Sequence, residues 1–170
     1  AHAPALGLAD DHDGADAVAM SDSRLRELRR HHVSMVFQHF GLLSHRKVID
    51  NVAYGLEIRG QSKAERRTKA QELVDLVGLT GNEDAYPHQL SGGMQQRVGL
   101  ARAIVAEPRI LLMDEPLGAV DALTREVMRD EIDKLIAATG KTVLFITHSI
   151  EEAILLGDRI VVFKSHPGAI

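Results

Sequence analysis

The chain has 170 residues and a net charge of −4, with 45% hydrophobic and 26% charged residues, which suits a single globular domain with a hydrophobic core. It has no cysteine, which excludes disulfides and thiolate metal sites, and it lacks the concentrated Lys/Arg surface that sequence-independent nucleic-acid binding needs. No apolar run approaches the roughly 18 residues of a membrane span, and the nine histidines are scattered rather than grouped as metal ligands.

The N-terminal part of the chain predicts one helix and one strand. Residues 1–19 are rich in Ala, Asp and Gly without periodicity, and we expect a poorly ordered segment there. Residues 21–30 predict a short polar helix. The apolar run VSMVF at 33–37 is bounded by polar residues and predicts a short strand that ends at Gln38.

The middle of the chain predicts mostly helices. Ser62, with Glu65 three positions later, forms a capping-box pattern and predicts a helix that ends at Gly78. A further helical pattern follows Gly93. Because this stretch is too long for a plain crossover between two strands, we interpret approximately 42–106 as a helical subdomain.

The C-terminal part predicts strands that alternate with helices. Three apolar runs predict buried strands, namely ILLMD at 110–114, TVLFIT at 142–147 and RIVVF at 159–163. Ser149, followed by Glu151 and Glu152, predicts a capped helix between the last two strands. The alternation predicts an α/β fold with a parallel sheet, and residues 107–170 form the C-terminal part of this core.

Two adjacent acids close the strand predicted at 110–114. Asp114 and Glu115 stand at its carboxyl end, where open α/β sheets place their ligands. A hydrated Mg²⁺ would suit such a pair, because Mg²⁺ takes oxygen ligands and prefers one or two carboxylates with phosphate. The first acid would then steer the metal and the second would orient or deprotonate a water. The alternative is an acid pair that only caps the next helix.

Two other polar residues also follow predicted strands. His148 could hydrogen-bond a γ-phosphate or hold a water, and Gln38 could reach a metal or a water through its amide. The alternative for the histidine is a bond to nearby backbone. Neither residue is specific by itself.

The string LSGGMQQ at 90–96 begins a helix. Ser91 is a good N-cap, and Gly92 and Gly93 would let a phosphate approach the backbone closely. Successive N–H groups and the positive end of the helix would then face the anion. The alternative is a plain glycine-containing turn before a helix.

In this order, the features resemble an ATP-binding-cassette (ABC) ATPase subunit. The resemblance implies a P-loop NTPase core with a parallel sheet and a helical subdomain, and an enzyme that binds ATP and Mg²⁺ and hydrolyses ATP. It also implies head-to-tail pairing, with ATP between the phosphate loop of one subunit and the signature motif of a second ATPase subunit. Gln38 resembles the family's Q-loop glutamine, 90–96 its signature motif and 110–116 its Walker B motif. GAVD at 118–121 resembles its D-loop, and His148 its switch histidine.

The resemblance further implies roles for single residues. Glu115 would polarise the attacking water, His148 would contact the γ-phosphate, and Gln38 would sense the nucleotide. Asp114, together with Gln38, would organise Mg²⁺. The residues that the resemblance places around the nucleotide and the subunit interface are Ser91, Gly92, Gly93, Gln95 and Asp121.

One part of the family's site has no counterpart in the sequence. A phosphate loop reads G-x-x-x-x-G-K-[ST] between a strand and a helix. The nearest string is GLEIRGQS at 55–62, where Gln61 stands in place of the lysine and a helix cap follows inside the helical stretch. We therefore expect the phosphate loop before residue 1, and we expect 1–170 to be a single, truncated nucleotide-binding domain that is inactive alone.

Two parts of the chain resemble importer subunits for different solutes. Residues 25–60 and 86–103 resemble importers of quaternary amines such as glycine betaine, choline or proline betaine. The sequence from Asp114 onward is closer to nitrate, sulfonate and taurine importers. We favour a quaternary amine importer, with the nitrate, sulfonate and taurine group as the alternative.

The importer hypothesis implies partners and has two rivals. It implies a transmembrane permease subunit, an indirect link to a solute-binding protein, no nucleic acid, and a peripheral position on the cytoplasmic face of the inner membrane. A cassette ATPase of DNA repair or translation is disfavoured, because no long coiled coil separates Gln38 from Ser91. A non-catalytic ABC fragment is supported by the missing lysine.

Overall fold

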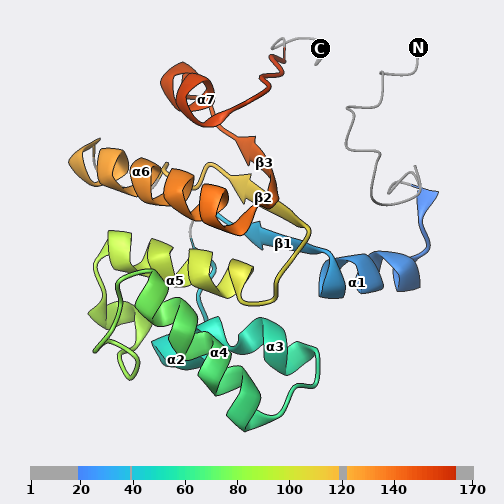
Figure 1. Cartoon of the computed structure of the whole chain (residues 1–170), viewed down its shortest axis with the longest axis vertical. Helices are drawn as coiled ribbons and strands as arrows, with labels where there is room; N and C mark the ends of the chain where they lie inside the picture. Colours follow the sequence, from blue (N-terminus) through green and yellow to red (C-terminus); the bar gives the residue numbers. More distant parts are fainter. Residues whose placement is uncertain (1–18, 39, 119–121, 164–170) are drawn as a thin grey trace.

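A parallel sheet of three strands runs through the upper half of the molecule in Figure 1. The computed structural model describes residues 19–38, 40–118 and 122–163. Strand β1 spans Val33–Val36, β2 spans Ile110–Asp114 and β3 spans Thr142–Ile146, in the order β1-β2-β3 with both pairs parallel. The α/β class with a parallel sheet, predicted from the sequence, is confirmed.

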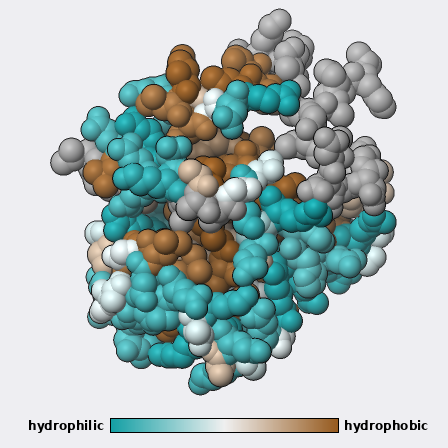
Figure 2. All heavy atoms as spheres, viewed as in Figure 1, coloured by the Kyte–Doolittle hydropathy of each residue, from teal (hydrophilic) through white to brown (hydrophobic). Residues whose placement is uncertain are grey.

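The prediction of a strand at 159–163 was wrong. These residues form no strand in the structure, and Ile160, Val162 and Phe163 are 50%, 74% and 66% exposed. An apolar run becomes a strand only where a neighbouring strand offers backbone partners and a packed surface, and this segment follows helix α7 away from the described core. Figure 2 shows hydrophobic residues over α7 and the segment after it.

Seven α-helices and one 3₁₀ turn are present in the described residues. The capping box predicted at Ser62 is present, because its Oγ accepts from Glu65 N–H at 3.3 Å and the Glu65 carboxylate accepts from Ser62 N–H at 3.2 Å. None of the helices in the described ranges combines the length and the apolar character that a membrane span requires. The helices are α1 (Asp22–His31), α2 (Val48–Val52), α3 (Tyr54–Ile58), α4 (Lys63–Leu76), α5 (Gly92–Ile104), α6 (Ala122–Thr139) and α7 (Ile150–Leu156), and the 3₁₀ turn is Pro87–Gln89.

Helix α5 contributes to two hydrophobic clusters on opposite sides. In Figure 1 it lies between α6 and the group α2, α3 and α4. Val98 and Ala101 pack in the cluster with α2 and α4, whereas Leu100 and Ile104 pack in the cluster with the sheet and α6. The boundaries that we predicted for a helical subdomain at 42–106 therefore remain a prediction, since α5 is shared between both clusters.

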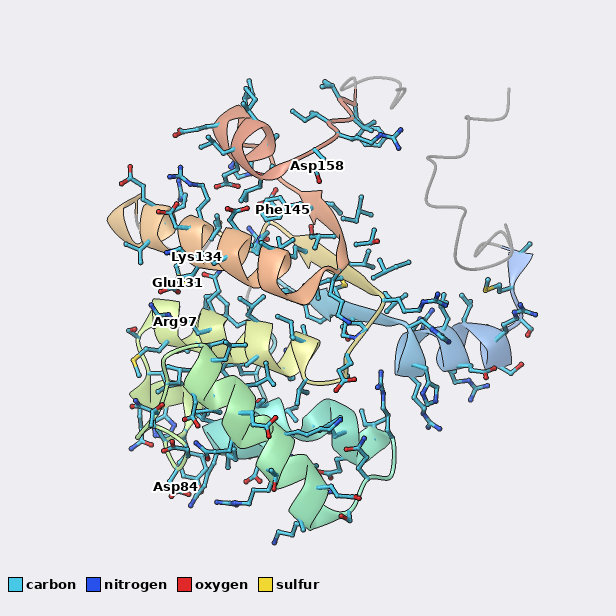
Figure 3. All side chains as sticks on the ribbon, in the orientation of Figure 1. Asp84, Arg97, Glu131, Lys134, Phe145 and Asp158 are labelled. Atoms are coloured by element: carbon cyan, nitrogen blue, oxygen red, sulfur yellow. The ribbon has the colours of Figure 1, made fainter. Side chains whose placement is uncertain are left out.

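An ion pair ties α5 to α6. The Arg97 guanidinium pairs with the Glu131 carboxylate of α6 and also donates to the Val77 carbonyl oxygen at 3.4 Å. Figure 3 shows the two labelled side chains, Arg97 and Glu131, between the two helices. The pair is partly buried, so solvent screens it less than a surface pair.

The two faces of the sheet differ in burial. Leu111 and Met113 of β2 are buried among α5 and α6, and Phe145 of β3 packs on the same side. Residues of the opposite face are more open, because Leu144 and Ile146 are 40% and 51% exposed.

We expect this difference to appear in stability measurements. Met113→Ala should lower the free energy of unfolding by about 2–5 kcal/mol, because it removes fully buried apolar atoms and leaves a cavity. Leu144→Thr should lower it by less than about 1 kcal/mol, because the side chain already faces solvent. Urea denaturation of the chain, followed by circular dichroism, measures both. Equal losses would show that the second face is packed as tightly as the first.

Candidate active site

Three polar side chains meet at the carboxyl edge of the sheet. The parallel strands end at this edge, which brings together the residues that follow β1, β2 and β3. Gln38 Nε2 donates a hydrogen bond to Glu115 Oε2 at 3.1 Å, and His148 Nδ1 lies 3.1 Å from Glu115 Oε1. Glu115 is thus the centre of a cluster built from three strand ends, which we call the Gln38–Glu115–His148 cluster.

The backbone at Glu115 is in the left-handed region, with φ of +44°. This conformation costs a non-glycine residue about 1–2 kcal/mol, and such strain gathers at functional sites. Two backbone bonds hold it: Glu115 N–H donates to Ile146 O at 2.9 Å, and Gly118 N–H donates to Glu115 O at 3.0 Å. The turn directs the carboxylate toward Gln38 and His148.

Gly118 makes room for this arrangement. A Cβ added at this position would lie 3.3 Å from Gln38 Nε2 and 3.3 Å from Glu115 O, which is tighter than ordinary contact. The absence of a side chain at Gly118 therefore lets the amide and the turn approach each other closely.

A small cavity of about 50 Å³ opens beside the cluster. It has the size and polar lining to hold water. Glu115 and His148 are 31% and 76% exposed at the side chain, so the cavity is accessible from outside. Its lining includes Glu115, Arg125, Thr147, His148 and Glu152.

The residues on either side of His148 form a hydrogen-bonded frame. Thr147 Oγ1 donates to Glu152 Oε2 at 2.6 Å and accepts from Ser149 N–H at 3.0 Å. Ser149 Oγ in turn caps α7 by accepting from Glu152 N–H at 3.3 Å. The capping pattern at Ser149 correctly predicted the helix start. It did not predict that the Glu152 carboxylate bonds to Thr147, which holds the strand end that carries His148.

Asp114 is half-buried at the end of β2, in register with Ile146. Within the described part of the chain its carboxylate makes no hydrogen bond or ion pair. Its carboxylate oxygens, like the amide oxygen of Gln38, are ligands of the kind that Mg²⁺ prefers, and no hydrogen bond joins the two side chains in the described part of the chain.

The start of α5 is open to solvent. Ser91 Oγ accepts from Met94 N–H at 3.3 Å, so Ser91 is the N-cap, and both Ser91 and Gly92 are exposed. A Cβ added at Gly92 would meet no atom of another described segment within 4 Å, and Gly93 is half-buried. Gln95 Nε2 donates a hydrogen bond to Leu90 O at 3.2 Å.

The structure does not bring every predicted site residue together. Among the described residues, no hydrogen bond or ion pair joins Ser91, Gly92, Gly93 or Gln95 to the Gln38–Glu115–His148 cluster. Asp121 lies outside the described residues.

The string GLEIRGQS does not form a phosphate loop. It covers α3 and the turn before α4, with Gly60 at φ of +77° and Gln61 N–H donating to Leu56 O at 3.1 Å. Helix α2, and not a strand, comes directly before α3, as the sequence led us to expect.

Comparison with known proteins agrees with the fold, which is that of a P-loop-NTPase-like α/β domain. A family model described as ABC transporter matches residues 7–118. The dimeric ATP-binding cassette MJ0796, solved in a post-hydrolysis state with ADP and Pi, superposes with a TM-score of 0.70 and 36% identity over 83% of this chain and 62% of that one. The chain therefore belongs to the ABC transporter family.

Two curated relatives are more similar in sequence. The glycine betaine transport ATP-binding protein OpuAA of Bacillus subtilis is 55% identical over 152 residues, which is 89% of this chain and 36% of OpuAA. The taurine import ATP-binding protein TauB of Rhizobium johnstonii is 52% identical over 136 residues, which is 80% of this chain and 52% of TauB. The chain thus spans between a third and about half the length of these two relatives.

The frame around His148 can be tested with two adjacent glutamates. Glu152→Ala should lower the free energy of unfolding by about 1–3 kcal/mol, because it leaves the part-buried Thr147 hydroxyl without its acceptor. Glu151→Ala should change it by less than about 0.5 kcal/mol, since the Glu151 side chain is 78% exposed and lies 3.7 Å from Arg129. Chemical denaturation measures both, and similar losses would contradict a structural role for the Thr147–Glu152 bond.

Proposed function

We propose that this chain forms part of an ATPase subunit that couples ATP hydrolysis to import of a quaternary amine such as glycine betaine. The observation that carries the proposal is the Gln38–Glu115–His148 cluster at the carboxyl edge of the sheet. Membership of the ABC transporter family supports ATP as the nucleotide.

Glu115 is the residue we assign to the attacking water. Its carboxylate borders the cavity and can accept a proton from that water. The water oxygen bonds to the γ-phosphorus, the bond to the β–γ bridging oxygen breaks, and ADP leaves with that electron pair. His148 would donate a hydrogen bond to the γ-phosphate, and Gln38 would hold the carboxylate and respond to the nucleotide.

Asp114 and Gln38 fit a Mg²⁺ ion that arrives with ATP. Bound Mg²⁺ would neutralise charge that develops on the phosphates. The described residues contain no group of three or more His, Asp or Glu that could hold a metal ion alone. Water and phosphate oxygens would therefore complete its coordination, as is usual for this ion.

We propose that the start of α5 binds ATP held by a second ATPase subunit. Ser91 and Gly92 are exposed, and no atom of another described segment lies within 4 Å of a Cβ built at Gly92, so an anion can approach the helix start. Gly93, Gln95 and Asp121 complete the set that we assign to this composite interface. The dimeric structures of MJ0796 support pairing of two such subunits, and we propose that they pair head to tail.

No G-x-x-x-x-G-K-[ST] string occurs in residues 1–170. We propose that the chain by itself binds ATP weakly and hydrolyses it slowly or not at all, because positioning and charge neutralisation supply most of the catalysis of phosphoryl transfer. In the complete transporter the subunit would lie on the cytoplasmic side of the inner membrane, bound to a transmembrane permease. A solute-binding protein would deliver the solute to this permease.

A direct test uses the full polypeptide in which this sequence occurs. Glu115→Gln should reduce ATP turnover at least about 100-fold while ATP-dependent pairing of the subunits persists, because it removes the base and keeps the shape of the side chain. Turnover is measured by phosphate release, and pairing by size-exclusion chromatography with and without ATP. Turnover near the parent rate would show that Glu115 is not the base.

Gly92→Ala is the matched contrast for this test. It should leave the free energy of unfolding of the chain unchanged or raise it by up to about 1 kcal/mol, because the new Cβ meets open space in a helix. It should nevertheless weaken ATP-dependent pairing, because the methyl group stands where the phosphate would approach. If the variant pairs as strongly as the parent protein, the start of α5 does not bind the ATP held by the second subunit.

Uptake measurements can identify the transported solute. Identity to OpuAA extends over more of this chain than identity to TauB, which favours quaternary amines over taurine. Cells that carry the complete transporter should take up labelled glycine betaine, and excess unlabelled betaine should compete while excess taurine should not. Competition by taurine alone would favour the second importer class.

A further inference from the structure

We infer that helix α5 positions the Gln38–Glu115 pair through the side chains of Gln96 and Arg102. The two residues are six positions apart, with Gly99 midway between them, so the three residues follow one another at steps of three along one side of the helix. Each contacts the loop that follows one of the two residues of the pair. That the pair is catalytic rests on the proposed function, whereas the contacts of Gln96 and Arg102 are independent of it.

Gln96 holds the turn at Glu115. Its side chain is 1% exposed, and its Nε2 donates a hydrogen bond to the carbonyl oxygen of Pro116, the residue directly after Glu115. Pro116 is buried, so without this donor its carbonyl oxygen would lose a partner that water cannot easily replace. The bond therefore fixes the backbone next to the left-handed turn.

Arg102 holds the loop after Gln38. Its Nη1 donates to Gly41 O at 2.6 Å and its Nη2 donates to Phe40 O at 2.7 Å. Phe40 and Gly41 both have positive φ, +58° and +54°, and their carbonyl oxygens meet one guanidinium. Burial lowers the pKa of Arg102, although an arginine keeps its charge at neutral pH.

The same loop also lies against the surface of α5. A Cβ added at Gly99 would come within 3.6 Å of Phe40 O, so the loop backbone approaches the helix backbone directly. Gln96, Gly99 and Arg102 thus attach both loops to one helix that the two hydrophobic clusters hold in place. The separation between the Gln38 amide and the Glu115 carboxylate depends on this helix.

Arg59 provides a matched control. Like Arg102, it donates to backbone carbonyl oxygens, those of Arg30, His31 and Ala106, and burial lowers its pKa too. These contacts lie away from the loops at 38–41 and 115–118. Arg59→Met therefore removes a similar structural interaction without touching the proposed positioning contacts.

The first measurement is amide hydrogen exchange of the chain without nucleotide. Gln96→Met should raise the exchange rate of the Glu115 and Gly118 amides at least about tenfold. The first amide donates to Ile146 O of β3 directly before the turn that Gln96 holds, and the second donates to Glu115 O within that turn. Arg102→Met should do the same at the Phe40 amide, which donates to Phe37 O at 3.0 Å. Arg59→Met should leave all three amides at the parent rate. The milder variant Arg102→Lys should give an intermediate effect if the methionine variant does not fold.

The second measurement is ATP turnover by the full polypeptide. Gln96→Met and Arg102→Met should lower kcat about 10- to 100-fold with little change in KM, since displacement by about 1 Å can cost that much. Arg59→Met should keep the kcat of the folded enzyme. Unchanged exchange in the Gln96 and Arg102 variants, or equal effects from Arg59→Met, would overturn the inference. If the parent shows no turnover, the proposed function fails, and the exchange result still decides the positioning.

Discussion

Val98 and Ala101 of α5 pack against α2 and α4, and Leu100 and Ile104 of the same helix pack against the sheet and α6. A helix with apolar residues on several sides has few orientations that bury them all. This constraint fixes α5 relative to the sheet, and the Arg97–Glu131 pair adds a polar contact to α6. The exposed start at Ser91 and the two loops that Gln96 and Arg102 hold are consequently parts of one rigid arrangement.

The candidate site combines this rigid support with an open side. Glu115 is held by two backbone hydrogen bonds and faces Gln38, while the His148 side chain is 76% exposed and leaves the cavity accessible. Such an arrangement can accept a ligand without moving the acid. The start of α5 is separate from this cluster and equally open, which suits a site that two subunits share.

The sequence predicted the strand ends well, because each is marked by an apolar run that stops at a polar residue. Parallel strands end at one edge, so Gln38, Glu115 and His148 could be expected to meet before their distances were known. The hydrogen bonds from Gln96 to Pro116 and from Arg102 to Gly41 could not be predicted, since they join residues that no local pattern links. The strand expected at 159–163 failed for a related reason: apolar composition does not reveal whether a partner strand lies alongside.

The left-handed backbone at Glu115 limits which residues can replace it during evolution. Glycine and asparagine adopt this conformation easily but carry no carboxylate, and β-branched residues are strongly disfavoured there. Aspartate keeps the acid on a side chain that is one methylene shorter. Selection for the carboxylate must therefore act against the preference of the backbone, and in a lineage where that selection is relaxed, glycine or asparagine is the expected replacement.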